Sequence, residues 1–378
     1  MLNKFLLFFG GVVLGSFIMV FLLRFVSGGN PMANRLLSPI GLQKQEVIGF
    51  LPYWLIGAEK KNYEGYVSSL SYFSLSIGPD GKILKYTDDA QTETEPGWLA
   101  LKSGKAKGAK SLVIFAADKE RIDILMGDPV TNAKNLAGDL LPIIREHGFT
   151  DINIDIEDVV EASDSARSSF TVFSKTFHDE IKSKNQDIII SIDVSPIVLF
   201  KPYLTDLTAI SKYYDKIIFM MYDFHFQNSS ATGAVSPVNG GGISAEFDTE
   251  VSVKKALEIL DAEKIIIGVP LYGYEWETLT NKPNAGVIPG TGITASNKRV
   301  EEFLEKCATC SATFDATSKE SHLVYKDEET DTYHQIFFPD RRAMEEKVKL
   351  VKKYRLGGIA LWAMGYEGKT ILEPLKGL

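Results

Sequence analysis

Eight short apolar runs, separated by longer stretches of helical periodicity, organise the chain from Glu46 onward. Each run has the length and the β-branched or aromatic content of a buried strand: Val47–Tyr53, Leu70–Ile77, Ser111–Ala116, Ile152–Glu157, Ile188–Val194, Lys216–Tyr222, Lys264–Leu271 and Gly358–Trp362. The amphipathic stretches between them include Asn132–His147, Ala166–Lys184, Val251–Glu263 and Arg342–Tyr354. Strands that alternate with helices of this length pair in parallel through helical crossovers. Eight such units in about 330 residues predict an α/β fold, a closed (β/α)8 TIM barrel.

The connection between the seventh and eighth runs is too long for a simple crossover. Between residues 275 and 340 it contains a helical stretch, Ser296–Lys306, and two strand-like runs, Ser321–Lys326 and Thr332–Phe338. The acidic residues between these two runs, 327–331, are typical of an exposed turn. We therefore expect a small α+β insertion between strands seven and eight, which forms one wall of a cleft over the barrel mouth.

The first residues differ in character from the rest of the chain. Phe5–Leu23 is an uninterrupted run of apolar or small residues between Lys4 and Arg24, and about 20 such residues span a bilayer. This length predicts that residues 1–27 form a transmembrane signal-anchor, that 28–45 are a linker, and that 46–378 are the folded domain. The chain would then be anchored in a membrane with its folded domain outside the cytoplasm. The alternative is secretion after cleavage of a signal peptide.

Charge and composition exclude several classes of partner. The formal net charge of -8 argues against nucleic acid. The five histidines show no ligand spacing, so we expect neither a metal site nor another cofactor. Cys307 and Cys310 are too few for a zinc ribbon and do not lie between a strand and a helix, as a redox pair would. They are either a structural disulfide or two free thiols. Separately, we expect the protein to be monomeric.

The run that ends at Glu157 carries a row of polar groups on one face. Three isoleucines alternate strictly with the polar positions, which are Asp151, Asn153, Asp155 and Glu157. A period of two places the isoleucines on one side of a strand and the polar residues on the other. Two acids two positions apart lie about 7 Å apart at the backbone, close enough to share a proton and to divide into an acid and a base. The alternative is an inward polar row that is satisfied by its neighbours and performs no chemistry.

Aromatic residues gather where the predicted strands end, which is where a barrel carries its catalytic groups. They are Tyr53 and Trp54 after the first strand, Tyr222 beside Met220 and Asp223 at the sixth, Tyr272 at the seventh with Trp276 nearby, and Trp362 at the eighth. Aromatic faces combined with carboxylates and phenols suit a neutral sugar, whose C–H faces stack on indole rings. We therefore expect a carbohydrate at this mouth. For any single tryptophan, filling of the core is the alternative.

These residues resemble glycoside hydrolase family 18, the chitinases and their relatives. The last three positions of that family's strand-four signature, DxxDxDxE, appear here as Asn153, Asp155 and Glu157, and its MxYD signature appears as residues 220–223. Trp362 corresponds to the family's late tryptophan, and residues 233–237 to a Gly-Pro-rich loop after strand six. The hairpin before the last strand is similar to that of bacterial spore-cortex and peptidoglycan-associated members. The resemblance covers essentially all of residues 46–378.

Two departures from the family pattern bear on Asp155. The first aspartate of the strand-four signature falls on Thr150, with Asp151 one place along, and Asn153 cannot ionise. If Asp151 turns inward, three carboxylates share one interior face, and we expect their repulsion to raise the pKa of Glu157. On strand three, the family's SxGG is replaced by residues 115–118, Phe-Ala-Ala-Asp.

The resemblance implies substrate-assisted retaining hydrolysis. Glu157 would protonate the glycosidic oxygen, Asp155 would orient the acetamido group of the substrate, and Tyr222 would hydrogen-bond its oxygen. Asp223 would hold a sugar hydroxyl or support Tyr222, and Trp362 would form the floor of the subsite for the reacting sugar. The other candidate substrate-binding residues are Asn153, Met220, Tyr53, Trp54, Tyr272 and Trp276.

The substrate that the resemblance implies is an N-acetylated polysaccharide or oligosaccharide with β-1,4-linked N-acetylglucosamine. We place peptidoglycan fragments ahead of chitin, because an anchored enzyme acts near its own envelope and the sequence contains no separate chitin-binding module. Two alternatives stay open. One is a catalytically weak or inactive carbohydrate-binding protein on the same fold, and the other is an unrelated use of the barrel.

Overall fold

The computed structural model describes residues 45–378, apart from 58–61, 89, 159, 243–244 and 377. The expected membrane segment, Phe5–Leu23, and most of the linker lie outside the described residues. Within the described part of the chain, no helix is both long enough and apolar enough to cross a bilayer. The predicted boundaries of the anchor and the linker therefore stay predictions.

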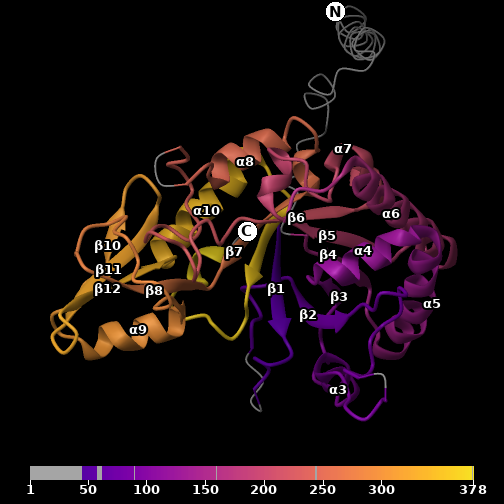
Figure 1. Ribbon diagram of the computed structural model, residues 1–378, viewed down its shortest axis with the longest axis horizontal. Coiled ribbons are helices and arrows are strands. Elements are labelled where there is room, and N and C mark those ends of the chain that lie inside the picture. The colour runs from indigo at the N-terminus through magenta and orange to yellow at the C-terminus, as the bar shows by residue number, and fades with distance from the viewer. Residues whose placement is uncertain (1–44, 58–61, 89, 159, 243–244, 377) are drawn as a thin grey trace, which may run out of the picture. The chain divides into compact units, whose positions relative to one another are not determined.

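Eight parallel strands close into a barrel in the order β1-β13-β7-β6-β5-β4-β3-β2 (Figure 1). The prediction of a closed eight-stranded barrel is confirmed, and two strands have the predicted bounds at both ends, β3 and β13. The barrel strands are β1 Glu46–Pro52, β2 Ser69–Ser76, β3 Ser111–Ala116, β4 Asp151–Ile156, β5 Ile189–Val194, β6 Lys216–Met220, β7 Ile265–Pro270 and β13 Gly358–Trp362.

Helices surround this barrel, and their ends are fixed by capping residues. The helix α5, for example, begins where the Asp128 carboxylate accepts the backbone N–H of Thr131, and it ends at Gly148 in a left-handed conformation. The helix expected over 251–263 ends earlier, at Ala256, and a separate 3-10 turn covers Ala262–Lys264. The helices are α3 Pro96–Lys102, α4 Lys119–Gly127, α5 Pro129–His147, α6 Asp164–Lys184, α7 Leu207–Ile210, α8 Thr249–Ala256, α9 Asn297–Lys306 and α10 Arg341–Tyr354, and the 3-10 turns are Pro196–Leu199, Ser211–Tyr213, Ala262–Lys264 and Glu373–Leu375.

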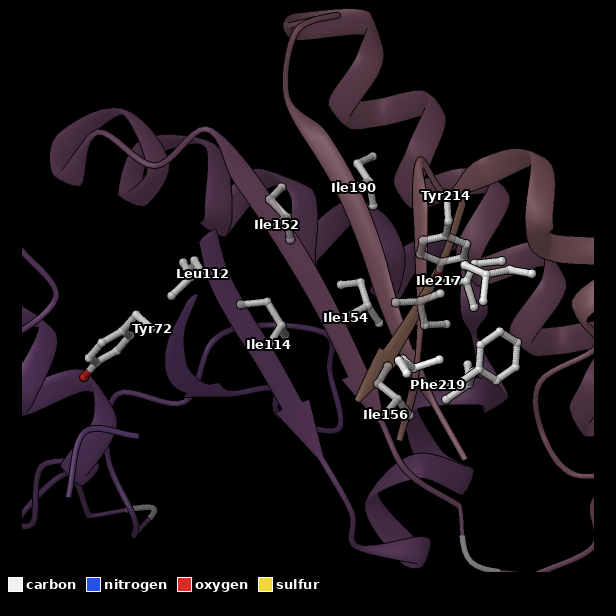
Figure 2. Packing of buried hydrophobic residues seen from close by; sticks show 14 of the residues in the cluster. Tyr72, Leu112, Ile114, Ile152, Ile154, Ile156, Ile190, Tyr214, Ile217 and Phe219 are labelled. Atoms are coloured by element: carbon white, nitrogen blue, oxygen red, sulfur yellow. The ribbon is translucent and has the colours of Figure 1, made fainter. Parts of the chain in front are cut away.

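The strand β4 has the two faces that its sequence predicts. Its isoleucines, Ile152, Ile154 and Ile156, are buried in the layer between barrel and helices, as Figure 2 shows. A fully buried isoleucine side chain contributes about 1.5–3 kcal/mol to folding. These three side chains therefore hold the strand in register and turn Asn153 and Asp155 into the barrel, where both are buried.

The opposite, N-terminal end of the barrel interior is closed by an ion cluster. Lys216 Nζ lies 2.5 Å from Glu46 Oε2 and 3.7 Å from Asp151 Oδ2. Asp151 is therefore neutralised at the far end of β4. The hypothesis that it extends the carboxylate row beside Asp155 is wrong.

A second sheet is formed by residues between β7 and β13. Its five strands run in the order β10-β11-β12-β8-β9. They are β8 Tyr272–Thr278, β9 Ile293–Ser296, β10 Thr313–Asp315, β11 Glu320–Asp327 and β12 Thr332–Phe338. Tyr272 was predicted at the end of barrel strand seven, but that strand stops at Pro270 and Tyr272 begins β8. Cys307 and Cys310, at the end of α9, form a disulfide.

The second sheet also holds the loop that follows β6. The Glu320 carboxylate accepts the backbone N–H groups of Val235 and Ser236 at 2.9 and 2.7 Å. The fully buried Lys347 donates to Ser236 Oγ at 2.9 Å and to Thr249 Oγ1 at 2.8 Å. Burial raises the pKa of Glu320 to about 7 and lowers the pKa of Lys347 to about 7. The two hydrogen bonds to Glu320 fix a loop of the barrel mouth against the second sheet.

Two glycines, one on a strand of the second sheet and one in a helix, give a test of how tightly the protein packs. A Cβ added at Gly273 would lie 1.8 Å from the carbonyl oxygen of Phe337, so Gly273→Ala should force β8 and β12 apart and destabilise the protein by about 2 kcal/mol or more. Gly138 lies inside α5 with nothing within 4 Å of such a Cβ. Gly138→Ala should therefore stabilise the protein by about 0.5–1 kcal/mol. Denaturant unfolding of both variants measures the two changes, and equal effects would contradict this packing.

Candidate active site

The candidate site lies at the carboxyl ends of β4, β5 and β6. Asp155 is the last inward residue within β4, and its exposed fraction is 3%. Glu157 follows one residue after the strand, but its backbone N–H still donates to the carbonyl of Ala116 on β3 at 2.8 Å. The strand geometry therefore continues to Glu157, which keeps it on the same face as Asp155.

Two adjoining cavities meet at Glu157. The smaller has a volume of about 140 Å³ and is lined by Asp155, Glu157, Tyr222 and Trp362, among others. The larger, of about 460 Å³, extends over the loop after β5 toward Phe224 and Phe247. Both cavities share the residues Glu157, Asp193, Met220, Tyr222 and Asp223. Glu157 therefore stands at the border between the two cavities.

The carboxyl groups at this border hold their protons more tightly than exposed ones do. Burial raises the pKa of Asp155 well above its usual range, and the charges of Glu157 and Asp193 add to that rise. Burial also raises the pKa of Glu157, with a further contribution from the charge of Asp223. The expected rise at Glu157 is therefore present, but Asp151 is not its cause. One of the neighbouring acids can stay protonated while another is ionised.

Tyr222 lies against the same carboxyl groups. Its pKa is raised far above the ordinary value by burial and then by the charges of Asp193, Glu157 and Asp155. The raised pKa favours the protonated phenol, which is able to donate a hydrogen bond to a ligand. Space for its ring comes from Gly268 on β7, where an added Cβ would lie 3.0 Å from Tyr222 Cε1.

Asp193, on β5, is a member of this cluster that the sequence analysis missed. Its carboxyl oxygen Oδ1 accepts a hydrogen bond from Asn153 Nδ2 at 2.8 Å, and its exposed fraction is 6%. The signal was present in the sequence. Ile190, Ile192 and Val194 alternate with Ser191 and Asp193 in the same period-two pattern that identified the inward face of β4.

Asp223 joins the barrel to the second sheet. It has a positive φ of 59°, and its Oδ1 accepts hydrogen bonds from Tyr272 at 2.6 Å and from Tyr274 at 3.1 Å. Tyr272 therefore belongs to the site because it holds Asp223. Its ring is buried, so it does not offer a surface on which a ligand could stack. Tyr274 is a second residue that the list of candidates lacked.

The aromatic residues at the mouth form one edge-to-face cluster. The indole of Trp362 lies 4.6 Å from the Phe73 ring and 6.5 Å from that of Trp54, between ring centroids. Trp362 lines the smaller cavity beside Glu157, as expected. Trp54 is 51% exposed and contacts Tyr53 edge to face at 4.9 Å. These two residues lie at the rim, outside the linings of both cavities.

Trp276 does not belong to the substrate-facing set. It is fully buried in the second sheet, where its ring packs on Tyr274 and Phe337. Its indole N–H donates to the carbonyl of Gln227 at 3.2 Å. The prediction that it contacts the substrate is wrong, because the strand that carries it leaves the barrel and turns the side chain into a separate core.

Nothing in the described part of the chain forms a metal centre. No group of three or more His, Cys, Asp or Glu residues there is placed to hold an ion. Among the described residues that line the two cavities, none is Lys, Arg or His. The functional groups that the site presents to a ligand are therefore carboxyl groups, a phenol and aromatic rings.

Comparisons with known proteins agree with this geometry. Residues 49–367 match the family described as Glycosyl hydrolases family 18. The sporulation-specific glycosylase candidate YdhD of Bacillus subtilis (strain 168) is 26% identical over 309 residues, which cover 80% of this chain and 67% of YdhD.

Solved structures share the fold. The spore cortex-lytic enzyme SleL of Bacillus cereus is 20% identical, with a TM-score of 0.68, over 89% of this chain and 75% of that one. A chitinase from Cycas revoluta, solved in complex with (GlcNAc)3, is 18% identical, with a TM-score of 0.70, over 88% of this chain and 98% of that one.

The buried acid at position 155 should reduce stability as the pH rises. Because burial raises its pKa in the folded state, the unfolded chain releases this proton at lower pH, from about pH 4 upward. The contribution of Asp155 to folding stability is therefore largest below that pH and falls above it. Asp155→Asn removes this loss, so the variant should exceed the parent in unfolding free energy by about 1 kcal/mol or more at pH 7 and match it near pH 4.

Denaturant unfolding at pH 4, 6 and 8 measures this difference. Asp151→Asn is the matched control on the same face of β4. It loses an ionic contact with Lys216 and should gain no stability with rising pH. A gain for Asp155→Asn that is independent of pH would contradict the electrostatic origin.

Proposed function

The chain belongs to glycosyl hydrolases family 18, and we propose that it cleaves N-acetylglucosamine-containing polysaccharide by substrate-assisted retaining hydrolysis. As a member of this family it is a glycoside hydrolase. One observation carries the finer proposal. Glu157, an acid with a raised pKa, stands at the border of two cavities, and Asp155 and Tyr222 line the smaller one with it.

Glu157 is the proton donor. Its raised pKa favours the protonated form, which a general acid requires. The sugar that reacts at its anomeric carbon occupies the smaller cavity, and the leaving sugar occupies the larger one. As the glycosidic bond breaks, the proton of Glu157 passes to the leaving oxygen.

The nucleophile is the carbonyl oxygen of the substrate's own 2-acetamido group. It forms a bond to the anomeric carbon and gives an oxazolinium ion. Asp155 accepts the acetamido N–H and offsets the positive charge, while the protonated phenol of Tyr222 donates to the acetamido oxygen. The ionised Glu157 then takes a proton from water, whose oxygen attacks the anomeric carbon and restores the acetamido group. The product retains the β configuration.

Trp362 forms the floor of the subsite for the reacting sugar, and Asp223 holds a hydroxyl group. Met220, which lines both cavities, contacts the sugar rings at their junction. Trp54 and Tyr53 lie further out at the rim and extend the aromatic surface along the substrate. Asn153, buried beneath Asp155, acts on the substrate only through the carboxyl groups.

We place β-1,4-linked N-acetylglucosamine in peptidoglycan fragments ahead of chitin. The likeness to a sporulation-specific glycosylase candidate and to a spore cortex-lytic enzyme supports this order. The apolar run Phe5–Leu23 supports a membrane anchor with the catalytic domain outside the cytoplasm, and secretion after signal cleavage is the alternative. The inactive carbohydrate-binding alternative has less support, because Glu157 and its neighbouring carboxyl groups are present together.

The decisive test is hydrolysis by the full-length protein. Chitooligosaccharides and purified peptidoglycan are offered in parallel, and proton NMR follows the anomeric signal of the first product. Initial release of the β anomer is expected, and cellooligosaccharides, which lack the acetamido group, should not be cleaved. Initial release of the α anomer would exclude the proposed mechanism.

Glu157→Gln should fold and bind oligosaccharide but lose hydrolysis by about 10²–10⁴-fold or more, because it lacks the proton of the general acid. In the parent, kcat should fall on the alkaline side as Glu157 loses that proton. Asp151→Asn, on the same strand but held by Lys216 at the far end, serves as the control and should keep parental turnover. Near-parental turnover of Glu157→Gln would show that another group is the acid.

Trp362→Ala should weaken saccharide binding by roughly 1–3 kcal/mol, because the reacting sugar loses its stacking surface. Calorimetric titration of chitooligosaccharide into Glu157→Gln, with and without the tryptophan change, measures this loss without turnover. Trp98→Ala is the matched control, since Trp98 lies on α3 beside Lys85 and Lys102. Equal affinity with and without Trp362 would assign its indole to packing alone.

A further inference from the structure

Two buried oxygen atoms of β4 have no hydrogen-bond donor among the residues that the structure describes. They are Oδ1 of Asn153 and Oδ1 of Asp155, which stand at successive inward positions of the strand. A buried polar oxygen without a partner is costly, so each such atom in a native protein calls for an explanation. Here both atoms belong to the row of inward polar residues on β4 that ends at Glu157. The neighbouring strand β5 determines how the Asn153 oxygen is oriented.

The amide of Asn153 is locked by two groups on β5. Ser191 Oγ donates to the backbone carbonyl of Ile152 at 3.4 Å, which leaves its lone pairs to accept from Asn153 Nδ2 at 3.0 Å. Asp193 Oδ1 accepts from the same nitrogen at 2.8 Å. Both contacts require the nitrogen to face β5, so the amide oxygen turns away from β5 to a place where no described residue donates to it.

We infer that Asp193 is a positioning residue of the active site, which acts through the Asn153 amide and through its charge on Asp155 and Glu157. This inference rests on the proposed function, because it assigns Asp193 to the same reaction. Asp193 supplies from β5 a buried carboxyl group that position 153, an asparagine, does not supply from β4. The Asn153 oxygen, held in place by Asp193, is then available to accept a hydrogen bond from the carboxyl O–H of a neutral Asp155.

The charges that face Asp193 have one sign. Asp155 and Glu157 approach from β4, and Tyr222 and Asp223 border the same cavity beyond β6. Burial raises the pKa of Asp193 to about 8; the hydrogen bond from Asn153 opposes this rise and the charge of Glu157 adds to it. Asp193 and Glu157 therefore compete for protons, and the row carries fewer negative charges than it has carboxyl groups.

Coupling between ionisable groups is reciprocal. Because the charge of Glu157 raises the pKa of Asp193, ionisation of Asp193 must in turn make Glu157 harder to ionise. The charge of Asp193 acts on Asp155 in the same direction. Loss of Asp193 should therefore let the remaining acids release their last proton at lower pH, which moves the alkaline limb of activity downward.

The experiment compares three variants of the full-length protein. Asp193→Asn removes the charge with little change of shape. The double variant Asn153→Asp with Asp193→Asn returns a carboxyl group to the row from β4. Asp151→Asn, on the same face of β4 at the neutralised end, is the control. Each is measured for kcat and KM on chitooligosaccharide from pH 4 to 10, and by ¹³C titration of the labelled Asp and Glu carboxyl groups.

We expect Asp193→Asn to lower kcat about 10-fold near neutral pH and to move the alkaline midpoint down by about one pH unit, with KM within about twofold of the parent. The ¹³C titration should show the same downward shift for Glu157. The double variant should recover most of the kcat and of the midpoint. The Asp151→Asn control should match the parent in all of these measurements.

A parental alkaline midpoint and a parental ¹³C titration of Glu157 in Asp193→Asn would overturn the inference, even while Glu157→Gln remains inactive and the proposed function stands. If the parent hydrolyses none of the substrates, the proposed function fails instead, and the titration still decides whether Asp193 controls the row. Should Asp193→Asn fail to fold, Asp193→Ala is titrated in its place, because it brings no new amide against Asn153.

Discussion

The structure depends on the burial of several carboxyl groups in a barrel mouth that gives them no cation. Asp155 and Asp193 are almost fully buried, and the described residues lining the adjoining cavities include no basic side chain. Burial without a counter-charge favours the protonated form of a carboxyl group. Each carboxyl group that does ionise makes the ionisation of its neighbours less favourable. The row can therefore hold protons at a pH where exposed carboxylates have lost theirs, which is the condition for acid catalysis near neutrality. The barrel supplies the required stability elsewhere, through the isoleucines that anchor β4 in the outer core.

Much of the site follows from local periodicity, and what was missed depends on contacts between distant residues. The alternation along β4 was enough to predict the strand, its inward face, and the pairing of Asp155 with Glu157. The same alternation marks Asp193 on β5, but a lone aspartate in a strand acquires meaning only when the neighbouring strand is known. Trp276 shows the converse error. Its closeness in sequence to strand seven suggested the barrel mouth, yet β8 pairs with β12 in another sheet, and no local pattern reveals which sheet a strand joins.

The second sheet supports one side of the barrel mouth from behind. Tyr272 and Tyr274 on β8 both reach Asp223, which follows β6 of the barrel. Glu320 on β11 holds the loop after β6 by two backbone N–H groups. The insertion therefore fixes both ends of the segment from Asp223 to Ser236, which borders the larger cavity. The insertion therefore shapes the larger cavity through this segment, although none of the residues of its five strands lines that cavity.

The presence or absence of a neighbouring cation separates two kinds of acidic residue in this protein. Asp151 and Asp155 lie on the same strand and the same inward face, yet Asp151 has Lys216 within 3.7 Å and Asp155 has acids beside it. In the second sheet, Glu275 pairs with Arg299, and the charge of Lys347 lowers the pKa of buried Glu320 toward its ordinary value. In the row of Asp155, Asp193 and Glu157, buried acids face other acids, and no Lys, Arg or His is among the described residues that line the adjoining cavities. Evolution of stability alone would remove such an arrangement, since replacing any one of these carboxyl groups relieves repulsion. That the three occur together at the junction of two cavities argues that the repulsion is retained for the protons it keeps in place.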